Sequence, residues 1–423
     1  MENTWLKLDN AAKLYPAKVR ADDTCVYRVY ASLKEAVQPE LLYRSVCDLK
    51  PRFPTFYVKL RNGFFWNHYE PNEQDLIVSR ENGDICALMD GHGNHGYLFA
   101  VRYDQRRISL EAFHALGDGY AALQFLNALV YRYLTLAGHR IDPMNRVATV
   151  DQRPSAAEME DSYTRYYTGA QKRAADACLA YQIRGTAFLS PAECGVVHGR
   201  METPRLLDAA HRYRTTITKY LTALLVQSIW LAGAENPEVR RLPICINVPV
   251  DMRKRLPSQT LRNFSLFFTA RISVMDSLLP MPEIIACLDR EFETNADIEA
   301  LRRLLNANVS VEKNPLITWM PLAVKQIMIG AVAAAISNRH LTSSLSNLGE
   351  LVLPDGMAPL IDHYGVIPPL GTDIPVIATA LSSCGQTEIT FVRKIIETDV
   401  ERFFFKGLVR DGVEVTLTTN RPE

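Results

Sequence analysis

Among the residues that can carry out acid–base chemistry, His114 stands in the most informative position. The segment from Ile108 to Asp118 reads ISLEAFHALGD and Gly119 follows, which gives the spacing His114-x-x-x-Asp118-Gly119. The histidine ends a strand-like segment and the glycine opens a helix-like one, so the imidazole stands at a strand end that a cleft can reach. Neutral histidine, with a pKa of about 6.5, is suited to removing a proton near neutral pH. His114 is therefore a candidate general base, and the alternative is a hydrogen-bonded histidine of the core.

The elements that position this histidine are visible in the first part of the chain. Thr24 to Leu33 is rich in β-branched and aromatic residues, which is typical of a strand. Apolar residues at helical spacing predict a helix from about Gly119 to Leu136. The remaining patterns predict a helix at 39–49, a hairpin of strands at 55–60 and 63–69, strands at 85–89, 97–103 and 108–114, and an irregular helical crossover at 156–181.

The second part of the chain also alternates predicted strands with predicted helices. Thr218 is the expected N-cap of a helix that continues to Leu231. The other patterns predict a helix at 282–305, strands at 242–249, 266–274, 341–345, 376–381, 388–392, 402–409 and 413–418, and a hairpin turn at 410–412. Because short turns join several neighbouring strands, we expect mixed α/β sheets rather than one parallel doubly wound sheet. We divide the chain into residues 1–185, with the crossover from about 155, and residues 186–423.

A glycine-rich loop resembles a nucleotide-binding motif but has the wrong context. Gly91 to Gly96 reads GHGNHG, which matches G-x-G-x-x-G. A dinucleotide-binding loop needs a helix to follow, because the helix N-terminus holds the pyrophosphate. The next residues, YLFAVRYD, alternate like a strand, so we expect a β-turn and no nucleotide site. His92 and His95 have no third ligand close in sequence, so no metal site is predicted.

Composition excludes several classes of protein. The 423 residues include 47 basic and 47 acidic side chains, so no net charge draws the chain to nucleic acid. The eight cysteines form no CxxC pair, and MENTWLKLDN does not have the pattern of a secretory signal. We therefore expect a cytoplasmic protein with reduced cysteines.

One apolar stretch invites a membrane interpretation. Leu316 to Ile336 has the length of a membrane span, but it carries Pro321, Lys325 and Gln326 near its middle. We predict a buried helix that begins near Pro321, with no stable membrane insertion.

The motif and several longer segments together resemble the chloramphenicol acetyltransferase-like superfamily. This group includes plant BAHD acyltransferases, peptide-synthetase condensation domains and alcohol acetyltransferases. The similarity spans about residues 5–418 and is greatest to the bacterial alcohol acetyltransferase-like branch. The segments that carry it are WLKLDNAAKLYPA, RFPTFYVKLRNGFFW, ICINVPVDMRKRLPSQTLRNF and SSLSNLGEL.

The resemblance implies two similar α/β lobes with a tunnel between them, and His114 midway along it as general base. It implies that the motif aspartate, Asp118, supports the turn by pairing with an arginine, for which Arg28, Arg253 and Arg262 are candidates. Gly119 then serves the motif's backbone. Ser346 and Asn347 of the SNLG segment are the candidates for stabilising an oxyanion.

The implied reaction moves an acyl group, acetyl or another short chain, from acyl-CoA to a hydroxyl. CoA is a co-substrate, so no permanently bound cofactor and no metal are expected. Arg253, Lys254 and Arg255 are candidates for contacting the CoA phosphates, or they form a solvated turn. Because both lobes belong to one chain, we expect a monomer.

Two departures from the family keep alternatives open. Phe113 replaces the histidine that condensation domains commonly carry before the catalytic one, and the BAHD signature D-F-G-W-G is absent. One alternative is a condensation-type enzyme that takes its acyl group from a carrier protein. The choice between a hydroxyl and an amine as acceptor is also open. Another is a non-catalytic binding or scaffold member of the fold.

Overall fold

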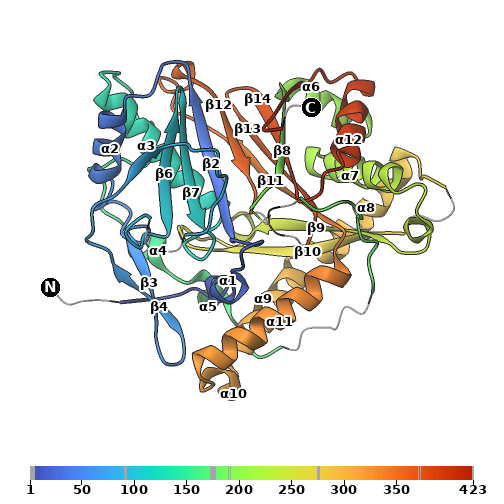
Figure 1. The fold of residues 1–423 in the computed structure, drawn as a ribbon, viewed down its shortest axis with the longest axis horizontal. Coiled ribbons are helices and arrows are strands. Elements are labelled where there is room, and N and C mark those ends of the chain that lie inside the picture. Colours follow the sequence, from blue (N-terminus) through green and yellow to red (C-terminus); the bar gives the residue numbers. More distant parts are fainter. Residues whose placement is uncertain are drawn as a thin grey trace.

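The structure is a computed structural model. It describes residues 5–89, 93–171, 178–188, 190, 192–273, 277–369, 371 and 373–421, with the backbone alone for 332–339. The described residues form two lobes, each built on a sheet that helices cover (Figure 1).

The first lobe is built on a five-stranded sheet with the order β12-β2-β7-β6-β5. Its central strands, β2 (Val26–Leu33) and β7 (Arg107–Phe113), are buried almost throughout. Helix α3 (Gly119–Leu136) packs on both of these strands, and its predicted bounds are confirmed. The lobe also contains β1 (Leu6–Lys7), α1 (Tyr15–Lys18), α2 (Pro39–Asp48), β3 (Val58–Asn62), β4 (Asn67–Pro71), β5 (Val78–Arg80), β6 (Phe99–Asp104) and the 3-10 turn Ala12–Leu14.

The second lobe is built on a seven-stranded sheet with the order β10-β9-β11-β13-β14-β8-β15. Strand β11 (Ser343–Leu351) runs parallel to its neighbours β9 (Ile244–Asp251) and β13 (Val376–Ser383), while the other pairs are antiparallel. The mixed α/β prediction is therefore confirmed. The remaining strands are β8 (Gly195–Glu202), β10 (Ser265–Ile272), β14 (Gln386–Arg393) and β15 (Thr416–Thr419). The helices are α6 (Thr203–Arg212), α7 (Ile217–Ala232), α8 (Met281–Asn295), α9 (Ile298–Lys313), α10 (Pro315–Thr318), α11 (Leu322–His340) and α12 (Asp399–Arg410), with 3-10 turns at Pro237–Arg240, Met252–Lys254 and Ala358–Leu360.

Two segments tie the lobes together. Strand β12 (Ile361–Ile367) comes from the second part of the chain but pairs with β2 in the first lobe's sheet. The short helices α4 (Ala156–Met159) and α5 (Ser162–Tyr166) lie in the predicted crossover. Leu261 donates a backbone hydrogen bond to Glu158 of α4, so the crossover is fixed to the second lobe. The division at residue 185 stays a prediction.

Several predicted elements are wrong. Residues 402–409 lie in helix α12 rather than a strand, because Val400, Phe404, Phe405 and Leu408 form a buried helical stripe, and 410–412 therefore close no hairpin. Residues 85–89 form no strand. The helix predicted at 282–305 is two helices, since Asp297 caps a new one. The cap of α7 is Thr216 rather than Thr218. The sequence patterns also missed β8, α6 and β12.

The glycine-rich loop leads into a strand, as its sequence predicts. Gly91 and His92 lie outside the described residues, and β6 begins at Phe99 and pairs with β7. The apolar stretch 316–336 contains α10 and most of α11, which begins just after Pro321 as predicted. Within the described part of the chain, no helix has the length and apolar character needed to cross a membrane. The prediction that α11 is buried is wrong, because much of one side faces outward.

Candidate active site

A cavity of about 1680 Å³ lies between the lobes, and His114 lines it. The histidine follows the last residue of β7, and its backbone N–H donates to the Cys25 carbonyl at 2.9 Å. The Tyr15 ring stacks on the imidazole with 4.4 Å between centroids, and the Tyr27 ring lies 4.9 Å away at a tilt. The bond to Cys25, just before β2, therefore fixes the main chain of His114, and the two aromatic rings hold the imidazole in one orientation.

Burial keeps this imidazole neutral. It lowers the pKa of His114 below 6.5, although the residue's own backbone carbonyl and the Asp118 charge act in the opposite direction. Its Nδ1 is covered and makes no hydrogen bond of ordinary geometry within the described part of the chain. The side chain lines the cavity, and because Nδ1 is covered, we assign Nε2 as the ring nitrogen that faces it. A neutral imidazole with Nε2 toward the cavity can accept a proton there.

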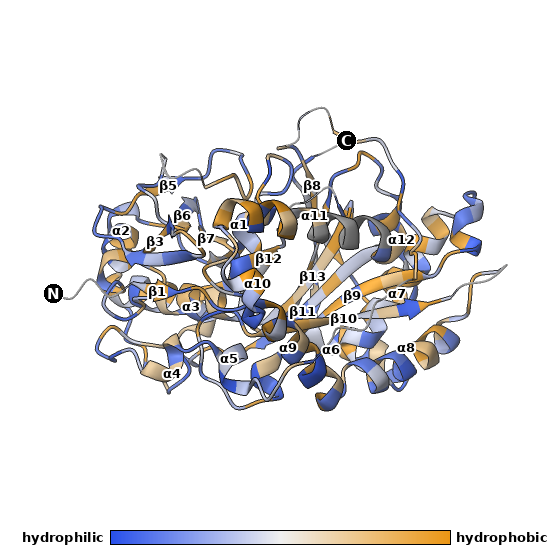
Figure 2. Cartoon of the chain, turned by 90° about the horizontal axis from the view of Figure 1, so that it is seen from below, coloured by the Kyte–Doolittle hydropathy of each residue, from blue (hydrophilic) through white to orange (hydrophobic). Residues whose placement is uncertain are grey.

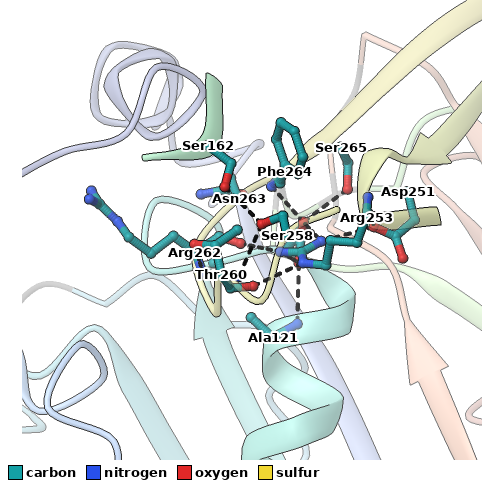
Figure 3. A network of polar contacts seen from close by, with 12 residues as sticks. Ala121, Ser162, Asp251, Arg253, Ser258, Thr260, Arg262, Asn263, Phe264 and Ser265 are labelled. Atoms are coloured by element: carbon teal, nitrogen blue, oxygen red, sulfur yellow. Dashed lines mark hydrogen bonds and ion pairs between the residues drawn. The ribbon is translucent and has the colours of Figure 1, made fainter. Parts of the chain in front are cut away.

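Asp118 is turned toward the second lobe. Its Oδ2 accepts from the backbone N–H of Phe264 at 2.8 Å and from the Ser265 hydroxyl at 2.9 Å. Its Oδ1 accepts from the Ala121 N–H and so caps α3. Arg253 completes the network with Nη1 at 2.9 Å and Nη2 at 3.2 Å (Figure 3).

These contacts make Asp118 a buried carboxylate with a compensating cation. Burial by itself would raise the pKa of Asp118, but the Arg253 charge and the hydrogen bonds lower it below its usual value. The same carboxylate caps a helix of the first lobe and holds β10 of the second. Asp118 therefore fixes the turn after His114 and joins the lobes.

Only one of the three candidate arginines pairs with Asp118. Arg28 instead lies 2.6 Å from Glu111 and 3.1 Å from Glu81, so its pairing with Asp118 was predicted wrongly. The reason is strand register: Arg28 lies directly opposite Glu111. Arg262 lies near Asp9, with 3.7 Å between Nε and Oδ2.

The predicted CoA-contacting residues separate into two kinds. Arg253 is 5% exposed and pairs with Asp118 and Asp251, so it is the least accessible of the three, and its contact with CoA phosphates is not proposed further. Lys254 and Arg255 line the cavity. Lys254 Nζ also lies beside Gly349 of the SNLG segment, 3.3 Å from where a Cβ would stand. The contact of Lys254 and Arg255 with CoA stays a prediction.

The SNLG segment lies on β11, and both candidate oxyanion donors line the cavity. The Asn347 amide is engaged, because Nδ2 donates to the Thr218 hydroxyl at 3.0 Å and Oδ1 accepts from the Gly349 N–H at 2.9 Å. These bonds hold an irregularity in the pairing of β11 with β13, where Gly349 has a φ of +85°. Ser346 is thus the better candidate donor.

The two motifs touch each other across the lobes. A Cβ added to Gly119 would lie 2.8 Å from Cδ2 of Leu348. The glycine of the first motif therefore leaves the space that the leucine of SNLG fills. This contact places the start of α3 against the strand that carries Ser346.

Sequence patterns missed three residues that hold His114 and the turn after it. The Tyr27 hydroxyl donates to the carbonyls of Gly117 and Asp118 at 2.9 and 3.0 Å, and Asn263 Nδ2 donates to the His114 carbonyl at 3.2 Å. Tyr15 is the third, through its stacking. All three lie in or next to segments that carry the family resemblance, but their types alone did not indicate a contact with His114.

Comparisons with known proteins support the fold. No protein-family model and no curated protein matches this chain. Among solved structures, polyketide synthase associated protein 5 from Mycobacterium tuberculosis aligns over 95% of this chain and 96% of its own, with 12% identity and a TM-score of 0.61. A variant of the starter condensation domain of rhizomide synthetase RzmA, in complex with C8-CoA and Leu-SNAC, aligns over 97% and 95%, with 13% identity and a TM-score of 0.56.

The epimerization domain from the third module of tyrocidine synthetase B aligns over 97% of this chain and 95% of its own, with 10% identity and a TM-score of 0.58. The chain has the two-lobed condensation-domain fold. The predicted fold class is therefore confirmed. At these identities the likeness concerns the fold alone, and membership of the alcohol acetyltransferase-like branch stays a prediction.

Proposed function

We propose that this protein is an acyltransferase that moves an acyl group from a thioester to a hydroxyl, with His114 as general base. The observation that carries the proposal is the orientation of His114, a neutral imidazole that lines the cavity between the lobes. Its environment is built from both lobes through Asp118 and Asn263. This arrangement favours an enzyme over a non-catalytic scaffold, which needs no oriented base.

The proposed reaction needs one proton carrier. His114 Nε2 takes the hydroxyl proton while the acceptor oxygen bonds to the thioester carbonyl carbon. The carbonyl π electrons move to oxygen, which becomes an oxyanion. When the carbonyl re-forms, the C–S bond breaks with its electron pair on sulfur, and the imidazolium returns the proton to the thiolate. No acyl-enzyme is required.

Acyl-CoA is the proposed donor, and a carrier-protein thioester is the alternative. The rhizomide synthetase domain is described in complex with C8-CoA and Leu-SNAC, a pairing that supports a thioester donor for this fold. Lys254 and Arg255, both on the cavity wall, are the proposed contacts for CoA phosphates. The volume of about 1680 Å³ exceeds that of ordinary ligand pockets and has room for donor and acceptor together.

The direct test is acceptor-dependent release of free thiol. We expect thiol release from acetyl-, butyryl- or longer acyl-CoA in the presence of a panel of alcohols and amines, with the ester or amide product identified by mass. Release that requires a loaded carrier protein would replace the donor assignment. No product from either donor class would contradict the proposed function.

A serine on β11 gives a second test of the proposed chemistry. We expect Ser346→Ala to lower kcat by about 10²–10³, since one donor to the oxyanion would be lost, with little change in KM. The matched control is Ser344→Ala, two residues earlier on the same strand, where the hydroxyl donates to the Asn247 carbonyl at 3.2 Å. Equal, small effects of both substitutions on kcat would remove Ser346 from the proposed mechanism.

A further inference from the structure

An exposed apolar surface lies where α10 and α11 meet the tip of the β3–β4 hairpin. We call it the apolar face and define it by Phe64, Leu316, Trp319, Val324, Ile327 and Met328. Four of these side chains are largely open to the surroundings: Leu316 is 80% exposed, Ile327 75%, Phe64 73% and Trp319 69%. The hairpin and the helix are joined, since Leu322 donates its N–H to the Phe64 carbonyl at 2.9 Å. Figure 1 shows this region projecting from the underside of the molecule.

The described part of helix α11 has apolar side chains on its outer side, unlike a helix that faces water. Val324, Ile327, Met328 and Ala331 recur at helical spacing and are exposed, and most of this part of the helix has the hydrophobic colour in Figure 2. Lys325 points inward and is buried. A surface helix in water normally has its apolar stripe inward and its charges outward. The outer side of α11 is therefore suited to apolar surroundings.

The inward lysine is held by a specific set of contacts. Lys325 Nζ donates to the Phe65 carbonyl at 2.8 Å and lies 3.3 Å from the centroid of the Trp66 ring. Burying an ammonium group is unfavourable without such partners. These contacts fix the rotation of α11 about its own axis. The exposure of Ile327 and Val324 is therefore a consequence of how the helix packs.

The apolar face is continuous with the cavity between the lobes. Met328 belongs to the face and also lines the cavity, and Ile317 and Ile329, next to residues of the face, line it too. An apolar molecule bound to this face could therefore enter the cavity along α11 without passing a charged side chain of the described part of that helix.

Charge distribution favours a lipid surface over a protein partner as the occupant. Between Asn314 and Ala331 the sequence holds one charged residue, Lys325, and it is buried. A protein interface normally has a polar rim that sets specificity, which this segment does not provide. The exposed charged residues that are nearest to the face in the sequence are basic: Lys313 just before α10, and Arg61 just before Phe64. Arg61 pairs with Glu70, with 3.2 Å between Nε and Oε2. Trp319 is of the aromatic type enriched at membrane interfaces. Phe64 is of a type that interfacial helices insert among lipids.

We propose that the apolar face docks on a lipid surface, with Phe64, Leu316, Trp319 and Ile327 inserted among the lipids. The docking is peripheral, through side chains of a folded protein. It places the cavity entrance at the lipid boundary. If the proposed acyl transfer holds, an acceptor or acyl chain that dissolves in lipid can enter the cavity from there.

Vesicle binding by the full chain tests the proposal without reference to catalysis. We expect the protein to co-sediment with vesicles of phosphatidylcholine and phosphatidylglycerol, and the emission of its tryptophans to shift to the blue. Ile327→Gln and Trp319→Ala should each lower the partition coefficient about tenfold, because each removes one large inserted side chain. The matched control is Ile396→Gln, which changes an isoleucine that is 52% exposed in another region, and it should bind like the wild type.

Three outcomes would overturn the proposal. One is no binding to these vesicles by a protein whose thermal unfolding is normal. Another is equal loss in Ile396→Gln and Ile327→Gln. The third is a dimer in sedimentation equilibrium that Ile327→Gln dissociates, since the face would then be covered by a second copy. None of these results bears on thiol release, so the proposed function is tested separately.

Discussion

His114→Ala is expected to lower acceptor-dependent thiol release by about 10²–10⁴ while the protein stays folded. The reason is the loss of the only group that we assign to carry the proton from acceptor to thiolate. Unfolding should change little, because the backbone bond from His114 to Cys25 does not involve the side chain. The measurement is kcat/KM for wild type and variant with the same donor and acceptor, beside circular dichroism spectra of both.

The pH dependence gives this prediction a second readout. Burial lowers the pKa of His114, so the imidazole stays unprotonated to a more acidic pH than a histidine in water. We therefore expect kcat/KM to be flat around pH 7 and to fall only below about pH 6.5, as protonation removes the Nε2 lone pair. His139→Ala, at a partly exposed histidine near the end of α3, is the control and should match the wild type. Undiminished thiol release in His114→Ala would refute the assignment of the base.

Asp118→Ala is expected to lower the free energy of unfolding by about 3–5 kcal/mol. The substitution removes the more buried of the two carboxylates that pair with the Arg253 guanidinium, and it removes the cap of α3. It also frees the N–H of Phe264, which ties β10 to the first lobe. The measurement is urea unfolding followed by circular dichroism, and activity should fall together with stability.

Asp251→Ala is the matched control for the Asp118 prediction. Asp251 also contacts Arg253, at 3.0 Å, but its side chain is about one-fifth exposed. Water can replace part of that contact, so we expect a smaller loss, about 1 kcal/mol. If Asp118→Ala unfolded like the wild type but had lost its activity, a direct catalytic role for Asp118 would replace the structural one.

The contribution of Asp118 should also depend on pH with a definite sign. Its pKa in the folded protein lies below the usual 3.8, because the Arg253 charge outweighs burial. As the pH falls, the carboxyl group of the unfolded state therefore binds a proton before that of the folded state does. The stabilisation by the ionised Asp118 is present in full above about pH 5. It is lost as the pH falls through the folded pKa. The difference in unfolding free energy between wild type and Asp118→Ala should be constant from about pH 6 to 8 and shrink below about pH 4.

Local patterns were sufficient for the elements around His114. The alternation before His114 and the helical spacing after Gly119 predicted β7 and α3, because the residue types in both segments follow a regular period, although the polar residues Ser109 and Glu111 of β7 are buried as well. The same reasoning failed at α12, where three consecutive phenylalanines favour a strand by composition. There Val400, Phe404, Phe405 and Leu408 have helical spacing, and packing on α7 buries this side of the helix.

The sequence by itself determined the candidate chemistry: a histidine at a strand end, an aspartate and a glycine that begin a helix, and a second motif, SNLG. Only the tertiary structure decided which partners these residues have. Arg253 is 135 residues from Asp118, and Arg28 was as good a candidate until strand pairing placed it against Glu111. A charge pair between the lobes depends on how the two sheets pack. The residue types do not indicate which charged side chains will lie close together in space. The outward direction of Ile327 and the inward one of Lys325 were decided in the same way, because the rotation of a helix is set by what it packs against.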